Sequence, residues 1–188
     1  ALAGGYVYVA DTGNDRIQRM QVDGTSATQL VPEGTLANPR GIAVWGGRVF
    51  AADDQHHRVA VFDVTGRLVT SIGSQGTGPG QLNYPYGVAV DPKGRVFVAD
   101  DLNQRVVRFG GVPLYPYRSR WGSYGTGPGQ LAYPRNIATD AAGNVYVTDP
   151  LNDRVQQFTA DGEFLNEWGS SGSGEGQFSY PQRIAVAG

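Results

Sequence analysis

A short turn-like segment recurs four times along the chain and constrains the fold more than any other feature. Its third copy reads Asp-Asp-Leu-Asn-Gln-Arg-Val over 100–106, and each copy lies between two short apolar runs. The arginines of successive copies are 42, 47 and 49 residues apart. Self-similarity at a fixed period indicates a repeat architecture, so the chain is expected to be an array of similar units. The four arginines are Arg16, Arg58, Arg105 and Arg154.

A proline recurs with nearly the same period, and four short strands are expected in each repeat. The first strand follows the proline, as in Val88-Ala89-Val90, and a turn such as Asp-Pro-Lys-Gly leads to the second strand, as in 96–99. The third strand follows the repeated arginine, and a glycine turn precedes a ragged fourth strand. About four strands per 40–45 residues is typical of a propeller blade. The prolines are Pro39, Pro85, Pro134 and Pro181.

The expected fold is therefore all-β: a β-propeller of four four-stranded blades, forming one domain over residues 1–188. The expected blades are 1–31 plus 182–188, 39–73, 85–122 and 134–169. The chain begins at a second strand, 6–10, and ends at a first strand, 184–186. The C-terminal strand is therefore expected to pair with the N-terminal blade and close the ring. A closed monomer is favoured, and exchange of that strand between two chains would give an eight-bladed dimer.

The repeats resemble those of the NHL-repeat β-propeller family over essentially the whole chain. The shared pattern is P-x-G-[IV]-A-V-D-x-x-G-x-[VF]-[YF]-V-A-D-x-x-N-x-R-[IV], followed by G-x-G-x-G-Q-[FL]. Departures are local: His56 replaces the asparagine, Ala187 replaces an aspartate, and Asn136 and Arg183 replace the glycine after the proline. The resemblance implies a binding platform for proteins, or for RNA in some animal members. Some similar propellers are metal-dependent lyases or hydrolases that use histidines or carboxylates around the channel, and this chain lacks a comparable set.

An aspartate and an arginine recur five residues apart across each turn between the second and third strands. A planar guanidinium can hold a carboxylate through two parallel hydrogen bonds, so the pair is interpreted as a structural clamp on the turn. A catalytic interpretation would require an active site in every blade. The pairs are Asp11/Arg16, Asp53/Arg58, Asp100/Arg105 and Asp149/Arg154.

The residues that follow the repeated proline differ between repeats, so they are the candidates for ligand binding. They are expected to surround the mouth of the central channel, where they could bind a carboxylate, a phosphate or a polar chain. The competing interpretation is a solvated rim whose arginines are offset by Asp15, Asp54, Asp101 and Asp153. The candidates are Arg40, Tyr86, Arg135, Asn136, Gln182 and Arg183.

The sequence gives little support for a metal site, a phosphate-binding loop or a catalytic nucleophile. His56 and His57 are adjacent, without a third ligand at metal spacing, so neither a metal site nor a cofactor is expected. A glycine-rich connector follows the fourth strand of a repeat, as in 76–82, 125–131 and 172–178. These connectors lack the strand-to-helix context and the Lys-Ser/Thr of a phosphate loop. With no cysteine and no recognisable Ser-His-Asp set, no catalytic residue is assigned.

The composition of the chain bears on two kinds of partner, nucleic acid and the membrane. A net charge of −2 argues against nucleic acid, and no apolar run approaches the roughly 20 residues of a membrane span. The compartment stays open. The favoured function is a non-catalytic propeller that binds a protein, peptide or small polar ligand at the channel mouth. The alternatives are a ligand-free scaffold, either engineered or excised from a longer propeller, and a metal-dependent enzyme of the lyase or hydrolase type.

Overall fold

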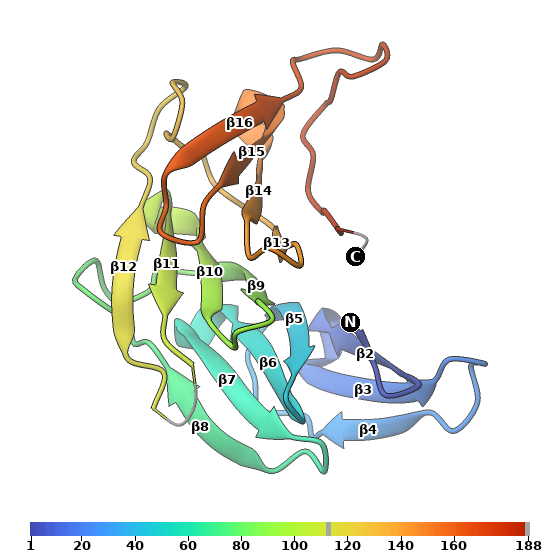
Figure 1. Cartoon of the computed structure of the whole chain (residues 1–188). Helices are drawn as coiled ribbons and strands as arrows, with labels where there is room; N and C mark the ends of the chain where they lie inside the picture. The colour runs from blue at the N-terminus through green and yellow to red at the C-terminus, as the bar shows by residue number, and fades with distance from the viewer. Residues whose placement is uncertain (112–113, 187–188) are drawn as a thin grey trace.

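The computed structural model describes residues 1–111 and 114–186, which form four antiparallel sheets of four strands each (Figure 1). The first sheet contains β1 (Leu2–Ala3), β2 (Tyr6–Asp11), β3 (Arg16–Gln21) and β4 (Thr28–Val31). The second contains β5 (Pro39–Trp45), β6 (Arg48–Asp53), β7 (Arg58–Asp63) and β8 (Leu68–Ile72). The third contains β9 (Pro85–Val90), β10 (Val96–Asp100), β11 (Arg105–Phe109) and β12 (Tyr117–Trp121). The fourth contains β13 (Ile137–Thr139), β14 (Val145–Asp149), β15 (Arg154–Phe158) and β16 (Phe164–Trp168).

The strands of each sheet are paired in the order in which they occur along the chain, as in a propeller blade. The all-β fold and its four four-stranded units are thus confirmed. The predicted blade boundaries stay a prediction, because 112–113 and 187–188, which they include, lie outside the described residues. None of the helices in the described part has the length and apolar character needed to cross a membrane.

Apolar cores lie between consecutive sheets and explain the continuous apolar runs of the second strands. In β6, Val49 and Ala51 pack towards the first sheet, whereas Phe50 and Ala52 pack towards the third. Successive side chains of a strand point to opposite faces, so a strand between two neighbouring sheets needs apolar residues at every position. All four of these side chains are fully buried. Tyr146, the counterpart of Phe50 in the fourth sheet, is only half-buried and stacks on its own sheet's Trp168 at 6.1 Å.

In the second and third sheets, the innermost strands approach their neighbours so closely that the residue two places after the repeated proline must be glycine. A Cβ on Gly41 would lie 2.8 Å from the Cα of Gly87, and a Cβ on Gly87 would lie 2.7 Å from the carbonyl oxygen of Arg135. Both contacts are with backbone atoms, which cannot rotate away. The glycines therefore set how closely the sheets meet around the axis.

The two chain ends differ from the expectation. The first sheet has an inner strand of its own, β1, which pairs with β2 through Leu2↔Val7 and Ala3↔Tyr6, so the expected start at a second strand is wrong. The described C-terminal residues 181–186 form no strand. The predicted closing pair is therefore not observed and stays a prediction, and its residues Ala187 and Gly188 lie outside the described residues.

The four sheets follow one another around an open arc, with both termini near the gap (Figure 1). The C-terminal segment lies along the fourth sheet, where the backbone N–H of Ile184 donates to Oδ1 of Asn136 at 3.2 Å. Neither the monomer nor the strand-exchanged dimer is distinguished by this arrangement, and the oligomeric state stays a prediction.

Candidate functional site

The turns between second and third strands build one end of every sheet in the same way. Each is a single 3-10 turn followed by a residue in the left-handed region, with φ between 49° and 56°. The side chain of that residue accepts a hydrogen bond from the backbone N–H that precedes the next repeated proline. His57 Nδ1 accepts from Tyr84 at 3.1 Å, Gln104 Oε1 accepts from Tyr133 at 2.8 Å, and Asp153 Oδ1 accepts from Tyr180 at 2.7 Å. Each proline is thus fixed beside a turn of the preceding sheet.

Three of the predicted rim residues meet at this end of the molecule. Arg40 is the second residue of β5, Tyr86 is the second residue of β9, and Arg135 lies two residues before β13. The guanidinium carbon of Arg40 lies 5.1 Å from the centroid of the Tyr86 ring, and that of Arg135 lies 4.6 Å from it. Both arginines are within the distance at which a cation is attracted by an aromatic ring, so Tyr86 brings them together.

Two buried carboxylates complete this group, which we call the mouth pocket. Asp54 Oδ2 accepts hydrogen bonds from Asn38 Nδ2 and from Arg40 Nε, the latter at 3.3 Å. Asp101 Oδ2 lies 4.0 Å from Arg135 Nη1. The pocket encloses about 260 Å³ and is lined by Asn38, Arg40, Asp54, Tyr84, Tyr86, Asp101, Leu102 and Arg135.

The polar atoms of this pocket are incompletely satisfied. Among the described residues, Oδ1 of Asp101 and Nε of Arg135 are buried without a hydrogen-bond partner. A buried polar atom without a partner costs roughly 1–3 kcal/mol. Both atoms are shielded from solvent, whereas the side chains of Arg40 and Arg135 are 32% and 25% exposed and stay within reach of a ligand.

Burial raises the pKa of Asp101 to about 6 from its ordinary value of 3.8. The positive charge of Arg135 opposes the rise, and the carboxylates of Asp54 and Asp100 add to it. Asp101 is therefore ionised above about pH 6 and increasingly protonated below it.

The raised pKa predicts a pH dependence of stability that Asp101→Asn should remove. Between pH 4 and 6 the folded protein binds more protons at Asp101 than the unfolded chain does, so the contribution of this group to stability falls as pH rises. Urea unfolding of both proteins at pH 4–8 should show the stability of the variant rising relative to the parent up to about pH 6 and then levelling.

Asp11→Asn is the matched control, because hydrogen bonds from Arg16, Asn14 and Gln18 lower the pKa of the Asp11 carboxyl to about 2. Its titration window lies below pH 4, so its difference from the parent should stay flat between pH 5 and 8. A flat difference for Asp101→Asn over pH 4–6 would contradict the proposed ionisation of Asp101.

The other predicted rim residues lie elsewhere. Asn136 and Arg183 line a second hollow near the chain ends, together with Ala1, and Gln182 is exposed and lines neither hollow. They were grouped with the mouth residues because they follow a repeated proline and differ between repeats. The six candidates thus fall into a mouth group of three and a group near the termini.

The acidic residues expected to offset the rim arginines also divide into two kinds. Asp54 and Asp101 lie against Arg40 and Arg135, whereas Asp15 and Asp153 accept hydrogen bonds from the backbone. Three residues that line the pocket were not among the predicted rim residues: Asn38, Tyr84 and Leu102. A signal for two of them exists, because Asn38 and Tyr84 each directly precede a repeated proline.

The repeated Asp/Arg pairs have contacts beyond their own turn. Arg105 Nε donates to Asp100 Oδ2 at 2.7 Å, and Arg154 Nε donates to Asp149 Oδ2 at 2.8 Å. The terminal nitrogens of both arginines also donate to carbonyls of the glycine-rich connector before their sheet, such as Thr77 for Arg105. Each pair therefore joins two consecutive sheets.

Neither histidine points to a metal site. His56 Nδ1 lies 2.9 Å from Asp53 Oδ2, and His57 is buried against Tyr84. Within the described residues, no group of three or more His, Cys, Asp or Glu side chains is arranged to hold a metal ion.

Comparisons with known proteins are consistent with this architecture. A family model described as a 6-bladed beta-propeller matches residues 33–114. A 69-residue stretch, 36% of this chain, is 46% identical to the RING finger protein nhl-1 of Caenorhabditis elegans and spans 7% of that protein.

Solved structures with a similar fold include a streptogramin B lyase, with a TM-score of 0.69 and 15% identity over 89% of this chain and 52% of the lyase. A chain of a Nidogen/Laminin complex has a TM-score of 0.68 and 21% identity, over 87% of this chain and 59% of that one. The virginiamycin B lyase of Staphylococcus aureus has a TM-score of 0.69 and 15% identity, over 99% of this chain and 58% of the lyase. This chain thus spans little more than half of these structures, and identities this low show the fold alone.

Proposed function

We propose that this chain, a β-propeller of NHL-like repeats, is a non-catalytic module that binds a peptide segment of a protein partner at the mouth pocket. The propeller fold supports a binding or scaffold role in general terms. Fold does not fix function, so the finer proposal depends on the chemistry of the pocket.

The observation that carries the proposal is the stacking of Arg40 and Arg135 on Tyr86, which brings two partly exposed guanidinium groups together in one pocket. A peptide segment offers backbone carbonyl groups and acidic side chains as acceptors for these guanidinium groups. The guanidinium groups add charge-assisted bonds to a carbonyl or a carboxylate. A pocket of about 260 Å³ is below the usual 300–1,000 Å³ of a drug-sized site, which suits a short peptide segment lying across it.

An enzyme is the competing class, since two of the similar solved structures are lyases. Their identity to this chain is too low to transfer an activity. The mouth pocket contains carboxylates and arginines, and its lining residues include no histidine, serine, threonine, cysteine or lysine. The geometry therefore favours binding over catalysis.

The proposal predicts that Arg40→Lys with Arg135→Lys weakens peptide binding at least tenfold while leaving the fold intact. Lysine keeps a positive charge beside Asp54 and Asp101 but loses the planar fork and much of the stacking on Tyr86. Truncation to alanine is a poorer test, because it would remove the partners of buried carboxylates. Peptides selected from a displayed random library would be titrated by calorimetry against parent and variant.

Arg118→Lys with Arg120→Lys is the matched control, because both arginines are exposed on β12, away from the pocket. It should bind the selected peptides as the parent does. Equal affinity of parent and mouth variant would remove the mouth pocket as the site. Failure to select any binder would favour the scaffold, and chemical change of a bound peptide, detected by mass spectrometry, would overturn the non-catalytic assignment.

A further inference from the structure

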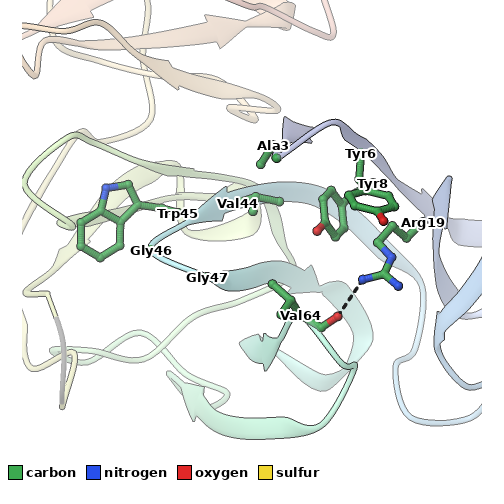
Figure 2. Close-up of a pocket in the computed structure, with 10 residues that line it drawn as sticks. Ala3, Tyr6, Tyr8, Arg19, Val44, Trp45, Gly46, Gly47 and Val64 are labelled. Carbon is green, nitrogen blue, oxygen red and sulfur yellow. Dashed lines mark hydrogen bonds between the residues drawn. The ribbon is translucent and has the colours of Figure 1, made fainter. Parts of the chain in front are cut away.

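A further cavity, distinct from the mouth pocket and from the hollow near the chain ends, lies between the first and second sheets (Figure 2). It is larger than the mouth pocket and lies at the opposite end of these sheets from it. It encloses about 570 Å³, within the range of small-molecule sites. Tyr6, Tyr8 and Arg19 line it from the first sheet, and Val44 and the turn at Gly46 line it from the second. Because β5 begins with the mouth residues and ends at Trp45, this cavity is separated from the mouth pocket by the length of a strand.

The corresponding place between the other sheets is filled. A Cβ on Gly94 of the third sheet would lie 2.6 Å from the ring of Trp45, which comes from the second sheet. A Cβ on Gly143 of the fourth sheet would lie 2.7 Å from Arg95 of the third. Against Gly47 of the second sheet, nothing lies within 4 Å. This place is therefore empty between the first and second sheets, whereas side chains fill it in the two interfaces that follow; we call the empty place the vacancy.

The vacancy has a cause in the sequence. Leu2-Ala3-Gly4-Gly5 aligns with Val44-Trp45-Gly46-Gly47, so Ala3 stands where the second sheet has Trp45. Figure 2 shows the Trp45 indole directed away from the tyrosines, so it does not fill the cavity of its own sheet. Space is thus left between Ala3 and the Gly46–Gly47 turn.

The wall of the first sheet is aromatic and positively charged. The guanidinium carbon of Arg19 lies 4.7 Å from the centroid of the Tyr6 ring, and Nη1 of Arg19 donates to the carbonyl oxygen of Val64 at 2.9 Å. Its Nε is buried without a hydrogen-bond partner among the described residues. No aspartate or glutamate lines the cavity, so the charge of Arg19 is not neutralised there.

We propose that this cavity is a binding site for a small planar aromatic molecule that carries a carboxylate or sulfonate. The aromatic part would occupy the place that Trp45 fills in the neighbouring interface, against Val44 and the tyrosine rings. The acidic group would accept from the guanidinium of Arg19 where it lines the cavity, in a partly buried place where a charge-assisted bond is strong. The site is independent of the mouth pocket and of the proposed peptide binding.

The probe for this site is 8-anilinonaphthalene-1-sulfonate, whose fluorescence rises in apolar surroundings, with N-phenyl-1-naphthylamine as the matched neutral probe. The parent should bind one sulfonate probe per chain. Arg19→Met should weaken binding of the sulfonate at least tenfold and change binding of the neutral probe less than twofold. Arg67→Met is the control, since Arg67 is a largely exposed arginine outside the cavity lining, and it should bind both probes as the parent does.

Ala3→Trp tests the location, because it places an indole where the neighbouring sheet has one. It should abolish binding of both probes and leave the melting temperature unchanged or raised. Circular dichroism of each variant establishes that it is folded. Sulfonate binding that survives Ala3→Trp, or that is lost equally in Arg19→Met and Arg67→Met, would overturn the site.

Discussion

Replacing Arg105 by alanine should lower the free energy of unfolding by roughly 3–5 kcal/mol, the usual cost of leaving a buried charge without its partner. Nε of Arg105 donates to Asp100 Oδ2 at 2.7 Å, and both side chains are buried. The terminal nitrogens donate to the carbonyl oxygens of Thr77, Gly78 and Gln81 at 2.7, 3.3 and 2.8 Å. Alanine would leave the Asp100 carboxylate and these three carbonyls without the guanidinium. Urea unfolding followed by circular dichroism measures the loss.

Arg16→Ala is the matched control, because it removes the same repeat position in a more exposed setting. Arg16 pairs with Asp11 at 2.7 Å, but their side chains are 26% and 21% exposed. Partly exposed pairs contribute roughly 0–1 kcal/mol, so the control should change stability little. Equal losses in the two variants would show that burial and the connector contacts are not what makes Arg105 important.

Gly87→Ala should be strongly destabilising for the addition of a single methyl group, with an expected loss of about 3 kcal/mol, the upper part of the usual range for overpacking. The new Cβ would lie 2.7 Å from the carbonyl oxygen of Arg135, 3.0 Å from the Cα of Asn136 and 3.1 Å from the N of Ile137. These are backbone atoms of the neighbouring inner strand, so the clash can be relieved only by moving one sheet relative to the next. Thermal unfolding should show a lower melting temperature.

Asn136→Ala serves as the counterpart, since Asn136 occupies the position of Gly87 in the fourth repeat. A side chain is already accommodated there, and its oxygen accepts only the hydrogen bond from Ile184. Its replacement should cost about 1 kcal/mol. If Gly87→Ala melts like the parent, the inner strands have more freedom to separate than the 2.7 Å approach allows.

The repeat pattern predicted the structural pairs well because both members lie five residues apart in one turn. Asp100 and Arg105 are directly opposite in the register of β10 and β11, as expected of residues that flank a tight connection. The contacts of Arg105 with the connector involve residues 24 to 28 positions earlier. Such contacts depend on how two sheets pack, which the periodicity of one repeat does not contain.

The mouth group was predictable for a similar reason. Arg40, Tyr86 and Arg135 occupy one position in three consecutive repeats, and a propeller brings equivalent positions of neighbouring blades to the same end. What the sequence could not supply was the stacking of both arginines on Tyr86, or which carboxylate faces which arginine. Those details depend on side-chain rotamers at the centre of the arc.

The chain ends were the weakest part of the prediction. β1 was missed because only Leu2 and Ala3 belong to it, too short a run for an alternating pattern to be recognised. Its alignment with Val44 and Trp45 becomes evident only through the shared glycine pair that follows. Arg183 was placed at the rim because it follows the repeated proline, and the structure has it lining the hollow near the chain ends.

The arginine–connector contact also bears on how such chains change in length. Arg58, Arg105 and Arg154 each donate to a carbonyl of the connector that precedes their own sheet. Each repeat therefore supplies an arginine that contacts the connector before it and a connector that the arginine of the next repeat contacts. Tandem duplication or deletion of one repeat in the gene would preserve these contacts. The number of blades can therefore change in evolution without a new kind of interface.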